Sequence, residues 1–395
     1  MSVVSQNMAK SIASGSMIRR MFEAGIELRK KHGADAVCDF SLGNPDLSPP
    51  PVVAKAMHEL ADRLHEPASL GYMPNAGFPW ALDKLAAWLS EQQNTPLTRG
   101  EVMLSCGAAG ALNSFFHSVL EPGDDVLGFA PYFVEYGFYT ANHGGVFKSV
   151  NCRPDDFGPD FAGLEAAITP KTRAVIINTP NNPSGAIYSA SDMRRLASIL
   201  DEASEKYGRN IYLISDEPYR FLAYDGLSVP PALPLSQNCV VAGSFSKNYG
   251  LAGERIGYIA ISPDLPGKET LMAGLILSNR TLGFVNPPVV GQYLMAAALG
   301  MPTDEALAIY TRRRDMLAAI LRDAGIEFML PQGSFYCFPK APGGDDQAFV
   351  DKLAEQLILA VPGRGFGYPG HFRICFAVDE KVIQRSAPGF KKAVK

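Results

Sequence analysis

The sequence predicts an α/β fold with two domains: a large domain whose mostly parallel sheet is covered by helices, and a smaller α+β domain. A chain of 395 residues is too long for one compact core. Through its middle, short apolar runs alternate with amphipathic helical patterns, and near residue 285 this alternation gives way to consecutive helices. We therefore expect an N-terminal arm and part of the small domain in 1–48, the large domain in 49–285 and the small C-terminal domain in 286–395.

The strands of the large domain are predicted from apolar runs. The run TRAVIIN is apolar throughout, as in strands buried on both faces of a sheet. The pattern that follows it begins with Ser and Asp and stops at Gly, as helices do. Strands are expected at 101–105, 124–130, 144–150, 172–178, 210–217, 238–244 and 255–261. Helices are expected at 108–120, 132–144 and 189–208.

The last hundred residues mix helices with short strands. Helices are expected at 284–300, 303–326, 345–359 and the C-terminus, and strands at 333–340 and 371–377. The first 45 or so residues hold one helix and the turn GNPD, and they could pack against either domain. We find no internal repeat and no low-complexity segment.

Composition argues against several classes of protein. The net charge of −4 and the lack of a long basic run, RRR at 312–314 being the densest, argue against a nucleic-acid groove. The six cysteines have no C-x-x-C spacing and the six histidines do not cluster, so no metal site is expected. The sequence also lacks a signal-peptide core and any apolar run of about 18 residues. We expect a cytoplasmic protein without a membrane span.

Polar residues follow the expected strands at their carboxyl ends, where ligands bind in parallel sheets. The small residues at 106–110 could admit an anion to a helix start, or simply form a tight turn. The loop TPNNPSG at 179–185 could present an amide to a cleft, or serve as turn chemistry alone. Asp216 ends an apolar strand, where a carboxylate is costly to bury without a partner. Its simpler interpretation is an exposed acid or a helix cap.

Lys247 follows the strand at 238–244 and is the most informative residue. Desolvation there would lower the pKa of the lysine and favour a neutral, nucleophilic amine. Ser244, Ser246 and Arg255 add hydroxyl donors and a fixed cation that suit a phosphate. Pyridoxal phosphate needs all of these groups: a lysine, an acid for its pyridine nitrogen, donors to its phenolic oxygen and a phosphate cup.

A competing motif is discounted. GFGYPG at 365–370 matches G-x-G-x-x-G, but it leads into a strand instead of following one and opening a helix. A dinucleotide site requires the opposite order.

Several blocks carry a resemblance to a known family. Four stretches resemble the sequence blocks of the class I/II aminotransferases, which are pyridoxal-phosphate enzymes of fold type I. In chain order they are NTPNNPSG, SDEPY, SFSKNYGLAGERIGY at 244–258 and a terminal FRICFA. The resemblance runs from about Gly43 to Arg373, nearly the whole chain. It implies an aspartate-aminotransferase-like fold and a homodimer with shared active sites.

The resemblance implies a role for each residue around the cofactor ring. Lys247 would bind the cofactor as a Schiff base and later move the proton between the substrate Cα and the cofactor. Asp216 would keep the pyridine nitrogen protonated, so that the ring accepts electrons. Asn182 and Tyr219 would hydrogen-bond the phenolic oxygen, and Tyr132 would stack on the ring face.

The resemblance also implies an anion site at each end of the cavity. The phosphate cup would consist of Gly107, Ala108, Ala109, Ser244, Ser246 and Arg255. Tyr72 would reach the phosphate of the neighbouring subunit. Arg373 would clamp the substrate α-carboxylate in a two-pronged salt bridge, with Gly43 and Asn182 beside it. The chain departs from the family at Ala108 and Ala109, which leave only backbone donors, and in GFPWALDKL, which lacks the usual arginine.

The implied activity is transfer of the amino group of an L-amino acid to a 2-oxo acid by a ping-pong mechanism, of aspartate or broad specificity. A lyase or decarboxylase on the same scaffold is the alternative, although a clamped carboxylate at Arg373 argues against decarboxylation. Arg280 either reads a side-chain carboxylate or is a helix-end arginine, and the second interpretation is favoured. A DNA-binding regulator is disfavoured because residues 1–42 are short and not markedly basic. Donor, acceptor and pathway stay open.

Overall fold

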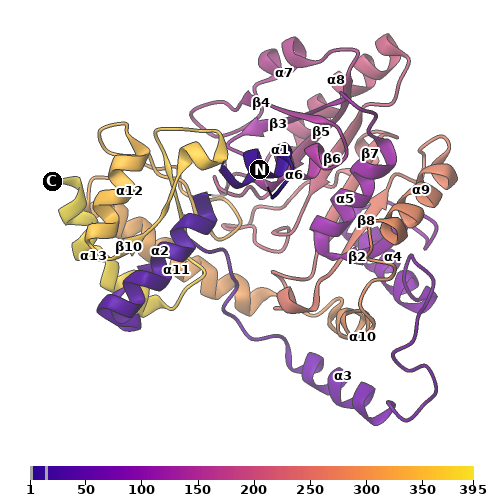
Figure 1. The fold of residues 1–395 in the computed structure, drawn as a ribbon, viewed down its shortest axis with the longest axis horizontal. Coiled ribbons are helices and arrows are strands. Elements are labelled where there is room, and N and C mark those ends of the chain that lie inside the picture. Colours follow the sequence, from indigo (N-terminus) through magenta and orange to yellow (C-terminus); the bar gives the residue numbers. More distant parts are fainter. Residues whose placement is uncertain (1–2, 14–16) are drawn as a thin grey trace.

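A seven-stranded sheet forms the centre of the larger part of the molecule (Figure 1). The structure is a computed structural model that describes residues 3–13 and 17–395. The strand order is β2-β8-β7-β6-β5-β3-β4, and β8 alone runs antiparallel to its neighbours within this sheet. The strands are β2 (Val102–Cys106), β3 (Asp125–Ala130), β4 (Val146–Asn151), β5 (Thr172–Asn178), β6 (Tyr212–Asp216), β7 (Cys239–Ser244) and β8 (Ile256–Ile261).

Helices cover both faces of this sheet, as expected for strands that are buried throughout. Apolar side chains of α4, α8 and α10 pack on one face, and those of α5 and α9 pack on the other. The helices of this part are α3 (Pro51–Asp62), α4 (Pro79–Gln93), α5 (Gly107–Val119), α6 (Glu135–Ala141), α7 (Phe161–Ala167), α8 (Ala190–Tyr207), α9 (Lys268–Thr281) and α10 (Val289–Ala298). The sequence pattern had not identified α3, α4 and α9.

Local signals set the ends of α8. Ser189 caps its first turn in a reciprocal capping box with Asp192. Gly208 ends the helix in the left-handed conformation, with φ of 62°. Both ends lie where the Ser/Asp start and the Gly stop predict them.

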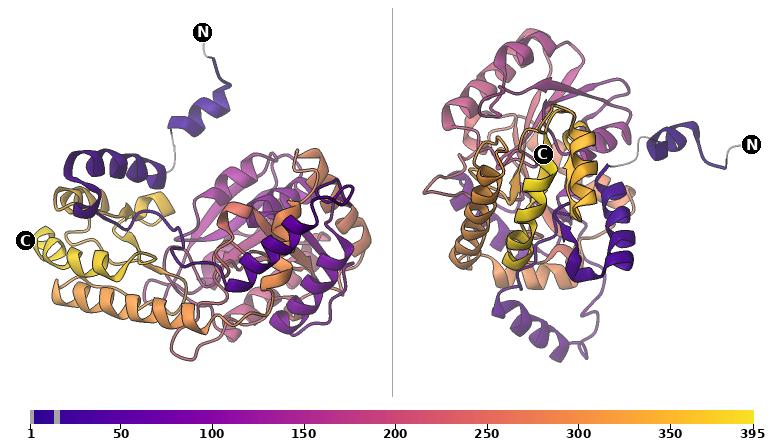
Figure 2. Two further views of the ribbon diagram at one scale, coloured as in Figure 1. Left: turned by 90° about the horizontal axis from the view of Figure 1, so that it is seen from below. Right: turned by 90° about the vertical axis from the view of Figure 1, so that its left-hand side faces the viewer.

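The smaller part combines both ends of the chain (Figure 2). The strand β1 pairs in parallel with β10, and β9, β11 and β12 form a second, antiparallel sheet. A core of its own fills the space between these strands and the surrounding helices. Its strands are β1 (Cys38–Asp39), β9 (Tyr336–Cys337), β10 (Ile358–Leu359), β11 (Val361–Pro362) and β12 (Phe372–Cys375). Its helices are α2 (Met17–His32), α11 (Asp304–Asp323), α12 (Asp346–Glu355) and α13 (Glu380–Val394), while α1 (Gln6–Ala13) stands apart in Figure 2.

The packing of α10 bears on the domain boundary. This helix lies against α3 and α4, and Leu294 and Met295 belong to the core of the large sheet. The sequence placed the boundary at 285/286 and so assigned α10 to the small domain. We propose a boundary between α10 and α11 instead. Two helices, α1 and α2, occupy the N-terminal segment where one was expected.

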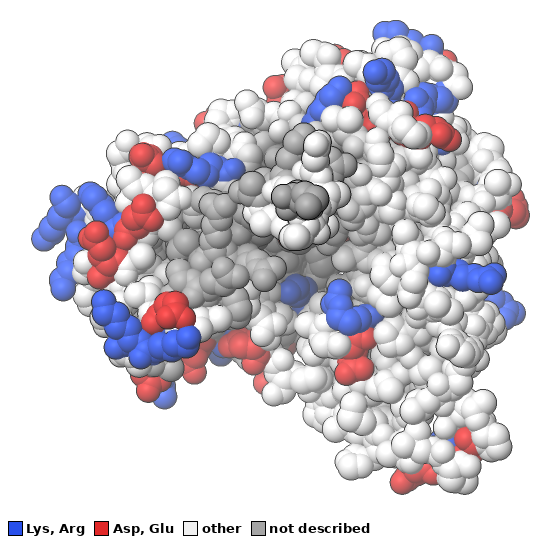
Figure 3. All heavy atoms as spheres, in the orientation of Figure 1, with Lys and Arg blue, Asp and Glu red and all other residues white. Residues whose placement is uncertain are grey.

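The surface mixes charges of both signs. Figure 3 shows lysine, arginine and acidic side chains scattered over the described part of the visible face, with both signs interspersed. Within the described residues, no helix is both long enough and apolar enough to cross a bilayer.

Candidate active site

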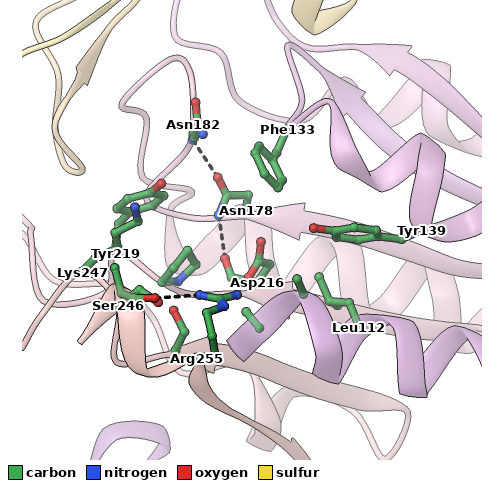
Figure 4. Close-up of a pocket in the computed structure, with 15 residues that line it drawn as sticks. Leu112, Phe133, Tyr139, Asn178, Asn182, Asp216, Tyr219, Ser246, Lys247 and Arg255 are labelled. Atoms are coloured by element: carbon green, nitrogen blue, oxygen red, sulfur yellow. Dashed lines mark hydrogen bonds between the residues drawn. The ribbon is translucent and has the colours of Figure 1, made fainter. Parts of the chain in front are cut away.

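A cavity of about 240 Å³ opens at the carboxyl edge of the large sheet (Figure 4). The parallel register explains its position, because Asn178 lies beside Asp216 on the neighbouring strand and Asp216 lies beside Ala242 on the next. Nine residues proposed from the sequence line it: Ala108, Ala109, Asn182, Asp216, Tyr219, Ser244, Ser246, Lys247 and Arg255. Six others were not foreseen: Leu112, Phe133, Tyr139, Asn178, Pro218 and Ala252.

Lys247 extends toward the N-terminal segment. Its Nζ donates a hydrogen bond of 2.6 Å to the Gly43 carbonyl oxygen. Burial lowers the pKa of Lys247 to about 8, and the cations of Arg373 and Arg255 act in the same direction. A lysine with this pKa is about one-tenth neutral at pH 7, far more than an ordinary lysine. The amine is therefore prepared to act as a nucleophile and as a base.

Asp216 is held by a tyrosine that sequence reasoning missed. The Tyr136 hydroxyl donates to Asp216 Oδ2 at 2.6 Å, whereas the buried Oδ1 has no hydrogen-bond partner among the described residues. Burial raises the pKa of Asp216 to about 7, partly opposed by the Tyr136 hydrogen bond. An unpartnered buried carboxylate oxygen is costly, so this geometry favours a ligand that brings a hydrogen-bond donor or a positive charge.

Two asparagines order the loop after β5. Asn178 Nδ2 donates to the Asp216 carbonyl oxygen at 2.8 Å, and Asn178 Oδ1 accepts from the Asn182 backbone N–H at 2.7 Å. Figure 4 shows these two contacts running from Asn182 to Asp216 along one side of the cavity. They fix the loop NTPNNPSG relative to the acid.

The start of α5 offers an anion site. Gly107 has φ of +73°, and a Cβ there would come within 2.7 Å of Arg255 Nη2. A Cβ on Gly257 would overlap the backbone of Gly107 and Ala108, so both glycines permit a close approach of β8 to the helix start. Arg255 adopts the left-handed conformation at φ of 51°, which aims its guanidinium at the same place. Backbone N–H groups at a helix start and a fixed cation suit a phosphate.

Arg373 is a buried cation beside this cavity. It is 1% exposed, and its guanidinium lies 4.7 Å from the Tyr336 ring centroid and 4.9 Å from that of Phe366. Its Nη1 donates to Asn182 Oδ1 at 3.1 Å and its Nη2 to the Ser41 carbonyl oxygen. Its Nε is buried without a partner, and no described carboxylate forms an ion pair with it. A buried guanidinium in this state favours an anionic ligand.

Tyr219 and Gly43 both lie next to Tyr336, the ring that the Arg373 guanidinium covers. The Tyr219 hydroxyl is 3.2 Å from the Tyr336 hydroxyl, an unforeseen partner. A Cβ on Gly43 would overlap the Tyr336 hydroxyl, so a glycine is needed there. Burial raises the pKa of Tyr219 well above its usual value, and it stays protonated at physiological pH.

Like Gly43, Gly107 and Arg373, three other proposed residues do not line the cavity. The Tyr132 ring packs 4.8 Å from that of Phe147, whereas its neighbour Phe133 lines the cavity. Tyr72 is 93% exposed. Arg280 is an exposed residue in the last turn of α9.

These groups fit pyridoxal phosphate. The free Asp216 Oδ1 can accept from a pyridinium nitrogen, and Lys247 stands within the same cavity. Ser244, Ser246 and Arg255 supply donors for a phosphate at the other end. The residues present therefore suit each polar part of the cofactor.

Comparison with known proteins gives a consistent answer. Residues 35–388 match the family described as aminotransferase class I and II. The aspartate/prephenate aminotransferase of Thermus thermophilus is 30% identical over 380 residues, 93% of each chain. The aspartate aminotransferase of Geobacillus stearothermophilus is 30% identical over 95% of this chain and 96% of its own.

Solved structures agree with these sequence relatives. An aminotransferase structure from Eubacterium rectale has a TM-score of 0.95 at 34% identity and covers 100% of this chain and 98% of its own. The aspartate aminotransferase of Thermus thermophilus with maleate has a TM-score of 0.88 at 27% identity, with both chains fully covered. Members of this family depend on pyridoxal phosphate, and the present chain belongs to the aminotransferase class I and II family and is an aminotransferase.

Proposed function

We propose that this protein binds pyridoxal phosphate at Lys247 and transfers the amino group of an L-amino acid to a 2-oxo acid. The observation that carries the proposal is the pairing of two unsatisfied groups around one lysine. Among the described residues, Asp216 Oδ1 is a buried acceptor without a donor, and Arg373 is a buried cation without a carboxylate partner. A ligand with a protonated ring nitrogen and a substrate with a carboxylate would satisfy both.

The bound cofactor supplies an electron-poor ring that stabilises negative charge at the substrate Cα. Lys247 would hold the cofactor through its Nζ, and as a free amine it would be the base that takes the proton from the substrate Cα. Tyr136 orients the Asp216 carboxylate toward the ring nitrogen. Arg373 fixes the substrate through its carboxylate, which keeps that carboxylate from leaving and so favours transamination over decarboxylation.

The relatives suggest the substrate class. The two sequence relatives quoted above are named for aspartate, and the Thermus thermophilus structure is one with the dicarboxylate maleate. We propose that one of the two substrates is a dicarboxylic amino acid. The second substrate can come from a wider set of amino acids. A panel of amino donors with 2-oxoglutarate, oxaloacetate and pyruvate, followed by the cofactor's absorbance, tests this choice.

We also propose a homodimer in which Tyr72 completes the neighbouring site. The side chains of Met57, Leu64, Leu70 and Leu277 are, like Tyr72, unusually exposed for their type, at 46% to 93%. Hydrogen bonds support the segment that carries Tyr72: Asn279 Nδ2 donates to the Asn75 carbonyl oxygen at 2.9 Å. An ordered segment that presents an exposed tyrosine suits a contact with a second copy.

Borohydride reduction followed by peptide mapping tests the cofactor proposal. The expected label is on the peptide that contains Lys247, and a label elsewhere would contradict the assignment. The control is Lys247→Ala, which should keep its fold and lose the label.

Subunit complementation tests the shared site. Lys247→Ala and Tyr72→Ala homodimers are each expected to be weak or inactive. When they are mixed and refolded together, the hybrid dimer holds one site with neither change, so activity should return. No recovery in a mixture shown to contain hybrid dimers would argue against Tyr72 crossing to the partner.

A further inference from the structure

Tyr336 forms a contact with the cavity through one of its lining residues. It lies on β9 in the smaller part of the molecule and is 2% exposed. Its hydroxyl is 3.2 Å from the hydroxyl of Tyr219, which follows β6 in the larger part. Tyr219 lines the cavity and Tyr336 does not. The two rings meet edge to face, with centroids 5.6 Å apart and an interplanar angle of 88°.

The direction of this hydrogen bond follows from counting hydrogens. Each phenol has a single hydrogen to donate. If Tyr219 donated to Tyr336, the hydrogen of Tyr336 would be buried without an acceptor, since its hydroxyl has no other partner among the described residues. Tyr219 would then offer the cavity only a lone pair. If Tyr336 donates, its hydrogen is satisfied and the Tyr219 hydrogen is free to point into the cavity.

We infer that Tyr336 is a positioning residue that donates to the Tyr219 oxygen and so directs the Tyr219 hydrogen toward the cofactor's phenolic oxygen. The inference rests on the proposed function, because Tyr219 belongs to the proposed site and Tyr336 acts on the cofactor only through Tyr219. It also strengthens the donation, because a hydroxyl that accepts one hydrogen bond becomes a better donor in the next.

The surroundings of Tyr336 support a donor role. The Arg373 guanidinium lies over its ring at 4.7 Å, and a nearby cation makes a phenol a stronger donor. Burial nevertheless raises the pKa of Tyr336 well above its usual value, so the hydrogen is retained throughout the physiological range. Gly43 leaves the space in which the hydroxyl sits. The contact also joins the two parts of the chain, so their relative position sets its length.

The test measures the pH midpoint of the visible absorbance change of the protein-bound cofactor. A hydrogen-bond donor stabilises negative charge on the cofactor's phenolic oxygen. That oxygen then holds less strongly the proton that it shares with the lysine nitrogen, so the midpoint falls. Tyr336→Phe should raise the midpoint by roughly half a unit, since it weakens one hydrogen bond without removing it. Tyr219→Phe should raise it by about one unit or more, since it removes that bond.

The double variant makes the test specific. If Tyr336 acts through Tyr219, the midpoint of Tyr219→Phe/Tyr336→Phe should equal that of Tyr219→Phe alone. A 3-fluorotyrosine at position 336, which keeps the fold and is a stronger donor, should move the midpoint down. The matched control is Tyr188→Phe, which removes the hydroxyl of another buried tyrosine that does not line the cavity.

Three results would overturn the inference. They are an unchanged midpoint in folded Tyr336→Phe, additive shifts in the double variant, and an equal shift in Tyr188→Phe. If Tyr336→Phe does not fold, an unchanged or higher midpoint in the protein with 3-fluorotyrosine at position 336 would also overturn the inference. A failed proposed function looks different, because the wild-type protein would then show no visible absorbance change and no label on Lys247.

Discussion

Replacing Arg373 tests the substrate clamp most directly. Arg373 is 1% exposed, and its guanidinium lies 4.7 Å and 4.9 Å from the Tyr336 and Phe366 ring centroids, with a free Nε and no ion pair to a described carboxylate. Removing one partner of a buried, hydrogen-bonded charge pair costs about 2–5 kcal/mol. Since about 1.4 kcal/mol is a factor of ten, Arg373→Met should lower kcat/KM for an amino acid by roughly 30-fold to several thousandfold. Arg373→Lys keeps the charge but not the planar pair of donors, so its kcat/KM should lie between those of the wild-type protein and Arg373→Met.

The fold should tolerate the change. Arg373→Met leaves Asn182 Oδ1 and the Ser41 carbonyl without their donors, at a cost of about 1–3 kcal/mol each. It also removes an uncompensated buried charge, which offsets several kcal/mol. We therefore expect the melting temperature of the cofactor-free protein to change by only a few degrees, measured by circular dichroism.

The assay compares each amino acid with the amine that lacks its carboxylate. Wild-type protein should prefer the amino acid strongly, and Arg373→Met should lose most of that preference because the amine never used the clamp. The reasoning is refuted if kcat/KM for the amine falls as far as for the amino acid. It is also refuted if the amino acid loses less than about tenfold.

Three further predictions concern stability and cofactor binding. In cofactor-free protein the pKa of Lys247 is about 8 in the folded state and 10.5 in the unfolded state. The free energy of unfolding should therefore rise between pH 8 and 10.5, by at most about 3 kcal/mol, and Lys247→Met should lose this rise in denaturant titrations. The pKa of Asp216 is raised from 3.8 to about 7 in the folded state, so its contribution to the free energy of unfolding is fully present below pH 3.8 and is lost as the pH rises toward 7. Asp216→Asn should remove this dependence of stability on pH. It should also weaken the retention of cofactor on dialysis. Gly257→Ala should lower stability by about 1–3 kcal/mol or more, because its Cβ meets the Gly107 backbone. Gly274→Ala in α9 should be neutral or stabilising, because its Cβ makes only ordinary van der Waals contact with Ser118 at 3.6 Å; equal melting temperatures would count against the close approach of β8.

Pattern and strand order were enough to predict much of the site. Apolar runs that end in Asp216 and Lys247 can be recognised from sequence, because the carboxyl ends of parallel strands lie at one edge of a sheet. The same logic predicted the glycine-rich start of α5 and the loop that contains Asn182. Local signals also predicted the ends of α8.

Other features depended on the packed structure. Tyr136 reaches Asp216 from 80 residues away, and Tyr336 reaches Tyr219 from 117 residues away. No local pattern identifies such partners, because the contact depends on how α6 and β9 pack. The choice between Tyr132 and Phe133 for the cavity wall likewise depends on which way two adjacent side chains turn after β3.

The sequence by itself determined the fold class, the family and the residues that follow each strand, because these depend on periodicity and on short blocks of fixed spacing. Tertiary structure decided which of these groups are left unsatisfied. Burial leaves Asp216 Oδ1 and Arg373 Nε without partners among the described residues, and it lowers the pKa of Lys247. Desolvation is a property of the whole surrounding core, and for that reason no single stretch of sequence reveals it.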